Sequence, residues 1–187
     1  MINNQIKKIA IIASISIAAC GGFGTYYYHH KTDKGKIYDF NPTIDMQPVI
    51  TIFNQNFDWL TANKNCSPTF LFKNRTYDNN PMHFGSLHIK VLREKDHVAG
   101  FTAYYMETQK QGRVLFVAVG HKFRGKGYGK ILTQHAMDEL RTMGAEHFAL
   151  WTRTDNFPAQ KIYKELGFVE VFDSGDGFVW FEYHPQN

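Results

Sequence analysis

Residues 114–130 constrain the fold more than any other part of this chain. Six apolar residues, Val114–Val119, are followed by a short run rich in glycine and basic residues, and then by a helical pattern over Tyr128–Met143. A strand that is apolar on both faces is typical of the centre of a sheet. The helical pattern places its apolar residues at three- and four-residue spacing, as on one face of a helix. The sequence therefore predicts a central strand that leads through a tight turn into a helix.

The turn between this strand and this helix has the composition of an anion site. Gly125, Gly127 and Gly129 let the backbone approach a ligand closely and leave N–H groups pointing outward, beside the positive end of the following helix. Basic side chains are present at Lys122, Arg124, Lys126 and Lys130. The spacing is neither that of a P-loop nor that of a dinucleotide fingerprint. A turn with solvated lysines is the alternative interpretation.

The remaining patterns predict one α+β domain over residues 36–187, built on a mixed sheet flanked by helices. Hydrophobic spacing predicts a helix over 46–62, with Asp45 as its N-cap and Pro48 in its first turn. A second short helix is predicted at 157–166, and residues 63–85 are interpreted as a short helix plus loops. The other strands are predicted at 36–40, 87–93, 98–107, 147–152, 168–172 and 178–183.

The N-terminal segment differs from the rest because residues 9–30 contain no Lys, Arg, Asp or Glu. A run of about 20 apolar residues is long enough to cross a bilayer. We therefore expect residues 1–28 to be a hydrophobic anchor or signal segment that inserts a single helix through 9–28, and 29–35 to be a polar linker. A cleaved secretory signal and a lipoprotein signal ending at Cys20 are the alternatives.

Composition sets broad limits on the partners. The chain has 187 residues and a formal net charge of +4. Residues 1–28 hold two lysines and no acid, so the rest carries 19 basic and 17 acidic residues, or +2. That excess is too small to indicate nucleic-acid binding. Two cysteines cannot form a disulfide framework. We expect no metal site, and the oligomeric state is left open.

Two motifs together resemble the GNAT superfamily of N-acetyltransferases. The first is Arg124-x-x-Gly127-x-Gly129 after a strand that ends in Val119. The second runs from Asn156 to Phe168 and contains Ala159, Ile162, Tyr163 and Gly167 at the spacing common in that family. The resemblance covers about residues 85–183, with a plausible first strand and helix at 36–62. It implies a GNAT-like mixed sheet and acetyl-CoA as co-substrate.

The resemblance also implies a cofactor site. The pyrophosphate would lie on the backbone amides of 124–129, and the pantetheine arm would pair with the strand edge at Phe116–Val119. Asn156 would hold the arm from the other side. The residues implied in cofactor binding are Phe116, Val117, Val119, Arg124, Gly125, Lys126, Gly127, Tyr128, Gly129, Lys130 and Asn156.

Two catalytic roles follow from the same resemblance. The N–H of Val119 would polarise the thioester carbonyl while a primary amine attacks it directly. Tyr163 matches the usual general acid, which protonates the departing thiolate. The alternative for Tyr163 is an ordinary place in the apolar stripe of its helix.

The general base and the acceptor are less defined. Members that acetylate ribosomal-protein N-termini often carry Glu where this chain has Trp151, and Gly120-His121 stands where Asp-Pro is common. His121, Glu107 and Tyr105 are the candidate bases, with ordered water as the alternative. The acceptor, a small-molecule or peptide amine, is expected between 61–85 and Asp173–Gly177. The aromatic residues expected there are Phe70, Phe72, Tyr77 and Phe84, which would either line the groove or pack beneath it.

Two other functions are compatible with these patterns. The first is a non-catalytic, membrane-tethered acyl-CoA-binding sensor, which Trp151 in place of an acid would favour. The second is an exported lipoprotein of unknown role. Because acetyl-CoA is an intracellular metabolite, we expect a single-pass anchor with the catalytic domain in the cytoplasm.

Overall fold

The computed structural model describes residues 35–72 and 84–185. Contacts divide the chain into Met1–Thr32 and Asp33–Asn187, and every described residue belongs to the second unit. Its elements are β1 (Lys36–Asp39), α1 (Pro42–Gln55), α2 (Phe57–Leu60), the 3-10 helix η1 (Pro68–Phe72), β2 (Phe84–Glu94), β3 (His97–Met106), β4 (Gln111–Val119), the 3-10 turn η3 (His121–Phe123), α3 (Tyr128–Thr142), β5 (His147–Arg153), α4 (Phe157–Glu165), β6 (Val169–Asp173) and β7 (Phe178–Tyr183).

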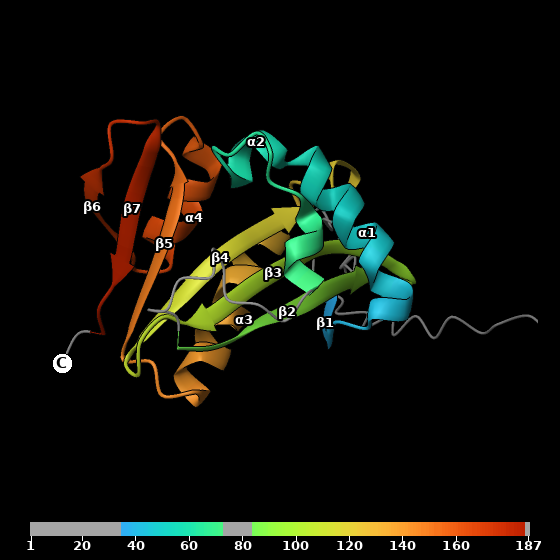
Figure 1. Cartoon of the computed structure of the whole chain (residues 1–187), viewed down its shortest axis with the longest axis horizontal. Helices are drawn as coiled ribbons and strands as arrows, with labels where there is room; N and C mark the ends of the chain where they lie inside the picture. Colours follow the sequence, from blue (N-terminus) through green and yellow to red (C-terminus); the bar gives the residue numbers. More distant parts are fainter. Residues whose placement is uncertain (1–34, 73–83, 186–187) are drawn as a thin grey trace, which may run out of the picture. The chain divides into compact units, whose positions relative to one another are not determined.

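These strands form one seven-stranded sheet in the order β1-β2-β3-β4-β5-β7-β6 (Figure 1). Every neighbouring pair is antiparallel except β4 and β5, which run parallel and are connected through α3. The prediction of a mixed sheet flanked by helices is thus confirmed. The helix between two parallel neighbours is the crossover that such a pair requires.

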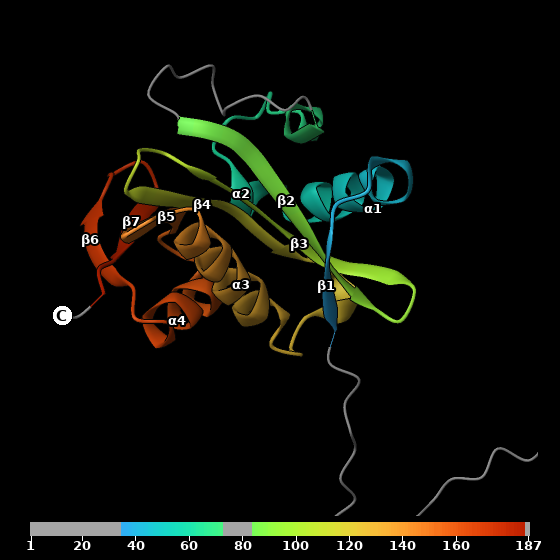
Figure 2. The same ribbon diagram turned by 90° about the horizontal axis from the view of Figure 1, so that it is seen from below.

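Helices cover the two faces of the sheet with different cores (Figure 2). On one face, α3 and α4 pack their apolar stripes against β3, β4, β5 and β7 around Leu140, Phe148 and Phe181. On the other face, α1 packs against β2, β3 and β4 around Phe53, Phe101 and Phe116. Because β4 contributes side chains to both cores, it is apolar on both faces, as the sequence predicted.

The sheet opens between β4 and β5. The two strands pair only from Gln111↔His147 to Arg113↔Ala149, although β4 continues to Val119 and β5 to Arg153. A β-bulge lies at the point of separation, because Ala103 and Tyr104 of β3 oppose Phe116 and Val114, leaving Leu115 as the extra residue. A bulge bends its strand and increases the local twist. Figure 1 shows β4 and β5 diverging beyond their short paired region.

The first helix begins earlier than predicted. Its N-cap is Asn41, whose side chain accepts from Thr43 N–H at 3.0 Å, and Pro42 occupies the first helical position. Asp45, predicted as the cap, lies inside the helix and is buried. Its carboxylate accepts from Asn41 N–H at 2.8 Å and pairs with Arg93. Asp45 therefore supports the helix start from inside the helix, and its prediction as the cap was wrong.

The same helix also ends earlier than predicted. Instead of one helix over 46–62, α1 ends at Gln55 and the single turn α2 follows after Asn56. The Asn56 side chain donates to Ile52 O at 2.7 Å, which competes with continuation of the helix. Within residues 63–85, predicted as a short helix plus loops, the structure shows the short 3-10 helix η1, while Tyr77 lies outside the described residues.

The predicted anchor at residues 9–28 also lies outside the described residues. Among the helices of residues 35–72 and 84–185, none is long and apolar enough to span a bilayer.

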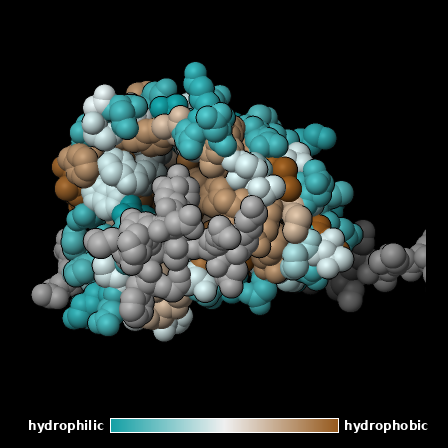
Figure 3. Space-filling view, in the orientation of Figure 1, coloured by the Kyte–Doolittle hydropathy of each residue, from teal (hydrophilic) through white to brown (hydrophobic). Residues whose placement is uncertain are grey.

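The far edge of the sheet is exposed. All five residues of β6 are exposed, with Val169 at 64% and Val171 at 52%. Figure 3 shows a hydrophobic area at the left margin of the molecule, where Figure 1 places β6.

Candidate active site

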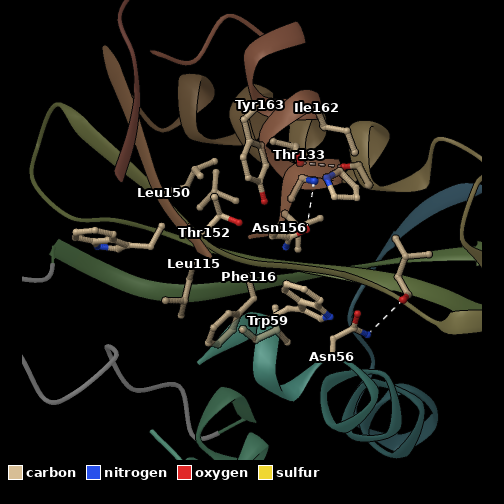
Figure 4. A pocket seen from close by; sticks show the side chains of 18 of the residues that line it. Asn56, Trp59, Leu115, Phe116, Thr133, Leu150, Thr152, Asn156, Ile162 and Tyr163 are labelled. Carbon is tan, nitrogen blue, oxygen red and sulfur yellow. Dashed lines mark hydrogen bonds between the residues drawn. The ribbon is translucent and has the colours of Figure 1, made fainter. Parts of the chain in front are cut away.

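A cavity of about 360 Å³ occupies the opening between β4 and β5. It is bounded by both strands, by α3 and α4 on one side, and by α2 on the other. In Figure 4, Tyr163, Ile162 and Thr133 lie on the helical side, and Trp59 and Asn56 lie on the opposite side. The cavity reaches Arg124 and Gly129 of the glycine-rich turn. The structure thus brings the two sequence motifs together around one space.

The β4 edge along this cavity carries free hydrogen-bonding positions. The N–H of Gly120, just after β4, donates to Ala99 O of β3 at 2.8 Å. Because backbone groups alternate sides along an antiparallel strand, Val119 and Val117 direct their N–H and C=O groups away from β3, toward the opening. Of these groups, the Val119 carbonyl already accepts a hydrogen bond from the Asn56 side chain. An extended ligand can therefore pair with this edge as an added strand. Phe116 contributes to the cavity wall, while its backbone groups face β3 by the same alternation.

The glycine-rich turn has the geometry of an anion site. Gly125 and Gly127 have φ of 78° and 79°, values at which a side chain is strained, and Gly127 is the residue that precedes α3. Within residues 35–72 and 84–185, the backbone N–H groups of Gly125, Lys126, Gly127, Gly129 and Lys130 have no protein acceptor, since the first bond of the helix runs from Ile131 to Gly127. Unpaired N–H groups at the start of a 15-residue helix are suited to bind an anion.

The basic side chains of this turn are held by specific partners. The Lys126 ammonium lies 2.8 Å from Glu94 at the β2–β3 turn, and Lys130 lies 2.9 Å from Glu165 on α4. The Tyr128 hydroxyl also donates to Glu94, at 2.7 Å. These hydrogen bonds from Lys126 and Tyr128 lower the pKa of Glu94. Lys126 and Lys130 therefore hold the turn to neighbouring elements and contribute less net charge than their number indicates.

Asn56 is the site residue that the sequence did not reveal. Its side chain accepts from Arg124 Nη2 at 2.7 Å and donates to Val119 O at 3.3 Å. It is 7% exposed and lines the cavity. One amide thus joins the end of α1, the end of β4 and the glycine-rich turn. Its position at a helix end was the only signal, and such asparagines are common.

Tyr163 lies on α4 with its hydroxyl directed into the cavity (Figure 4). The side chain is 9% exposed and packs against Phe168 and Phe181. Burial raises the pKa of Tyr163 to about 12. Among the described residues, no hydrogen bond occupies the hydroxyl. Tyr163 is therefore both a core residue and a proton donor available to a ligand.

Asn156 lies across the cavity from β4, at the start of α4. Its side chain accepts from Ala159 N–H at 3.4 Å and caps the helix, and it lines the cavity. Capping fixes the side chain while its amide NH₂ remains available to a ligand.

The candidate bases lie outside this cavity or have other partners. Glu107 is bound by Arg113 through two nitrogen atoms, and the His121 Nε2 lies 2.9 Å from Gln55 O, so that this nitrogen carries the proton. Tyr105 is 3% exposed and belongs to the α1-side core. Trp151, at the position of the expected acid, lines the cavity and is 40% exposed.

A second cavity, of about 390 Å³, lies where the acceptor was expected. Residues 61–63 and the β6–β7 turn contribute to its wall, as predicted. Of the two alternatives predicted for the aromatic residues, the structure shows packing beneath the groove for two of them, while the side chain of Phe84 lies outside those described. Phe70 lies with its ring centroid 6.0 Å from that of Phe116, and Phe72 stacks on Phe40 at 5.2 Å, so both pack beneath the groove. Tyr77 is outside the described residues.

Comparison with known proteins agrees with this geometry. The Acetyltransferase (GNAT) family model matches residues 50–168, which is more than half of the chain. N-alpha-acetyltransferase 30 of Schizosaccharomyces pombe is 34% identical over 61 residues, covering 33% of this chain and 41% of that protein. The [ribosomal protein bS18]-alanine N-acetyltransferase of Salmonella typhimurium is 32% identical over 80 residues, covering 43% and 53%. The matches thus span about half or less of these relatives.

Solved structures show the same fold at low identity. Ard1 from Thermoplasma volcanium has a TM-score of 0.64 and 22% identity, covering 82% of this chain and 99% of its own. PaiA N-acetyltransferase from Thermoplasma acidophilum, in complex with coenzyme A, has a TM-score of 0.61 and 14% identity, covering 81% and 99%. Together with the open strands and the glycine-rich turn, these matches show that the chain belongs to the GNAT family of acetyltransferases.

Proposed function

We propose that the protein is an acetyl-CoA-dependent N-acetyltransferase that moves an acetyl group to a primary amine by direct attack. The observation that carries the proposal is the separation of β4 from β5. It places an open strand edge, the unpaired amides of the glycine-rich turn and the Tyr163 hydroxyl around one cavity. Named relatives of this chain are N-acetyltransferases, which supports the same reaction.

The residues present fit acetyl-CoA. The unpaired N–H groups of Gly125, Lys126, Gly127 and Gly129, with the Arg124 side chain beside them, would hold the pyrophosphate. The β4 edge at Val117 and Val119 would pair with the pantetheine amides. Asn156 would hold the same arm from α4. Bound there, acetyl-CoA supplies an activated acetyl group as a thioester.

The chain's own groups then assist the transfer. The N–H of Val119, on the open edge, donates to the thioester oxygen as negative charge develops on it. The amine nitrogen forms a bond to the carbonyl carbon, the carbon–sulfur bond breaks, and Tyr163 gives its proton to the sulfur. The amine loses one proton to water, and Tyr163 recovers its proton from solvent. Because burial raises the pKa of Tyr163 to about 12, its hydroxyl keeps its proton before the reaction. A free thiolate, with a thiol pKa of about 8.5, would not remove that proton, so the transfer has to accompany the breaking of the carbon–sulfur bond.

The competing function is an acyl-CoA-binding sensor without turnover, and Trp151 in place of an acid is the feature that favours it. The melting temperature of the full-length chain, measured with and without acetyl-CoA, shows whether the chain binds this co-substrate. Release of free thiol with a panel of amines separates the enzyme from the sensor. We expect stabilisation by millimolar acetyl-CoA and amine-dependent thiol release. Stabilisation without thiol release would support the sensor, and no stabilisation would overturn both functions.

We also propose that residues 9–28 anchor the chain in a membrane with the acetyltransferase domain in the cytoplasm. The support is the uncharged run over 9–30 and the intracellular supply of acetyl-CoA. Protease added to intact cells should then leave the domain uncut. Digestion from outside would contradict this placement and would favour the exported lipoprotein.

A further inference from the structure

The second cavity approaches the separated strands from the side opposite α3 and α4. It shares a wall with the first cavity, formed by Leu60, Val114, Leu115, Phe116 and Trp151. No residue of α3 or α4 contributes to it among those described, whereas the segment after α2 and the β6–β7 turn do. A molecule in the second cavity therefore meets the first cavity at the strand opening. This is the approach that an acceptor needs if acetyl-CoA occupies the α3 side.

One uncompensated negative charge lies in the second cavity. Its charged lining residues, within the described ranges, are Arg113 and Asp176. The Arg113 guanidinium forms an ion pair with Glu107 and lies 3.9 Å from the Trp180 ring centroid, so it already has partners and Glu107 offsets its charge. Asp176 accepts a hydrogen bond from the uncharged Ser174 hydroxyl and makes no ion pair with any described residue. The Arg153 guanidinium lies outside this lining, over the Phe178 ring at 4.6 Å from its centroid, so it is only beside Asp176 that the cavity favours a cation.

The rest of the wall is largely aromatic and aliphatic. Trp151 is 40% exposed, although its ring is fixed against Trp180 at 4.7 Å and Phe172 at 5.3 Å. Phe178 lines the same cavity from the β7 side. An exposed but immobilised indole gains free energy when an apolar group covers it, and its face attracts a cation. The wall is thus suited to a ligand with a large apolar or aromatic body.

Neither cavity offers a free base of suitable strength. Across the described lining residues of both cavities, the one carboxylate is Asp176 and there is no histidine. An amine must be neutral to attack. Near pH 8, an α-amine with a pKa of about 7.8 is neutral roughly a hundred times more often than a lysine ε-amine with a pKa of about 10.4. The site therefore favours an acceptor that deprotonates without assistance.

From these three observations we infer the acceptor class, an inference that rests on the proposed N-acetyltransferase function. The acceptor is an α-amine that carries an aromatic or large apolar side chain and no neighbouring carboxylate, as at the start of a peptide or in an amino-acid amide. The side chain lies against Trp151 and Phe178, and Asp176 attracts the ammonium group before it loses its proton.

A panel of amines tests each property separately. Phenylalanine amide has an α-amine, an aromatic side chain and no carboxylate. Free phenylalanine adds a carboxylate, and alanine amide lacks the aromatic ring. Glucosamine replaces the apolar side chain with a polar sugar, and Nα-acetyl-lysine amide offers only an ε-amine. Initial rates of thiol release with the full-length chain should give phenylalanine amide a kcat/KM at least tenfold above each of the others. Glucosamine or the ε-amine reacting equally well would overturn the inference.

Two substitutions connect the preference to these residues. Asp176→Asn should raise the KM for phenylalanine amide about tenfold and leave the KM for acetyl-CoA unchanged. Asp173→Asn is the matched control, because Asp173 is the last residue of β6 before the same turn, accepts from Gly175 N–H at 2.8 Å and does not line the cavity. Trp151→Ala should reduce kcat/KM for phenylalanine amide to near that for alanine amide. Unchanged kinetics in both Asp176→Asn and Trp151→Ala would overturn the inference.

The experiment separates this inference from the proposed function. If acetyl-CoA stabilises the chain but phenylalanine amide is not the preferred acceptor, the acceptor class alone is wrong. If acetyl-CoA neither stabilises the chain nor releases thiol with any amine of the panel, the proposed function fails and the inference fails with it.

Discussion

The cavities on the two sides of the separated strands offer a ligand different kinds of contact. The α3 side presents backbone N–H groups, the edge of β4 and the helix-capping side chain of Asn156, all fixed by local structure. The opposite side presents aromatic side chains and a single carboxylate, Asp176. Backbone groups recognise a constant feature such as a pyrophosphate, whereas side chains set the identity of a variable partner.

The two sides also differ in how the chain builds them. The proposed anion site comes from one continuous segment, residues 124–130. The second cavity is assembled from residues 60–63, Trp151 and the β6–β7 turn, which are far apart in the sequence. Substitutions on the α3 side should therefore change the handling of acetyl-CoA, and substitutions on the other side should change the handling of the amine.

The largest effect should come from Tyr163, which lines the cavity on the α3 side. Tyr163→Phe should lower kcat by about 10²- to 10⁴-fold, the usual range for loss of a general acid, with little change in either KM. Fold stability should change little, because the hydroxyl makes no hydrogen bond with another described residue. Rates of thiol release and thermal melts check both. The control is Tyr104→Phe, a buried tyrosine whose hydroxyl donates to Glu139 at 3.1 Å away from the cavity. A normal kcat in Tyr163→Phe would remove the general acid from the mechanism.

The next effect comes from a matched pair of glycines. Gly127 at the α3 side has φ of 79° and Gly175 in the β6–β7 turn has φ of 77°, and at neither would an added Cβ meet another atom within 4 Å. Alanine at either position should therefore cost a similar 1–2 kcal/mol of unfolding free energy. Gly127→Ala should raise the KM for acetyl-CoA about tenfold, and Gly175→Ala should leave it unchanged. Equal effects on that KM would mean that the glycine-rich turn does not bind the cofactor.

Asn56, at the end of α1, contacts both the end of β4 and the glycine-rich turn, and its substitution tests these contacts. Asn56→Ala should lower the free energy of unfolding by about 1–3 kcal/mol, because buried partners such as Val119 O lose their hydrogen bond. The loss of its bond to Arg124 should also raise the KM for acetyl-CoA by several-fold. Asn54→Ala, at an exposed position on the same helix, is the control. Denaturant unfolding and initial rates measure the two effects, and identical behaviour of the two variants would contradict the role of Asn56.

The smallest effect concerns pH. Because burial raises the pKa of Tyr163 to about 12, the tyrosine should remain a proton donor between pH 8 and 10, and kcat should not fall there on its account. In the unfolded chain a tyrosine ionises near pH 10. The stability that Tyr163 contributes is therefore complete below about pH 10 and is lost as the pH rises toward about 12. Thermal melts from pH 9 to 11 should show a smaller decline in Tyr163→Phe than in the wild type. An equal decline would show that Tyr163 is not buried as described.

The sequence predicted the α3 side well because that side depends on local chemistry. A buried strand, a glycine-rich turn and a helix follow one another directly, so that Arg124, Gly127 and Gly129 could be placed without knowledge of distant contacts. Strand and helix positions from β2 to β7 were also predicted within a few residues, since periodicity and turn residues mark them.

The sequence did not predict features that depend on distant contacts. The role of Asn56 requires the end of α1 to meet Arg124 and Val119, 68 and 63 residues away. The burial of Asp45 depends on Arg93, 48 residues away, and the position of the Arg113 guanidinium depends on the ring of Trp180, on a strand far along the chain. The sequence pattern does not indicate the β-bulge at Leu115, because the residues before and after it in the strand are all apolar.

The central claim is that the separated strands divide a cofactor side from an acceptor side. The most direct test is the dissociation constant of acetyl-CoA, measured by titration calorimetry on the full-length wild type, Gly127→Ala and Asp176→Asn. We predict binding by the wild type, about tenfold weaker binding by Gly127→Ala, and binding by Asp176→Asn equal to that of the wild type. No binding by the wild type at millimolar acetyl-CoA, or equal weakening by both variants, would contradict the account.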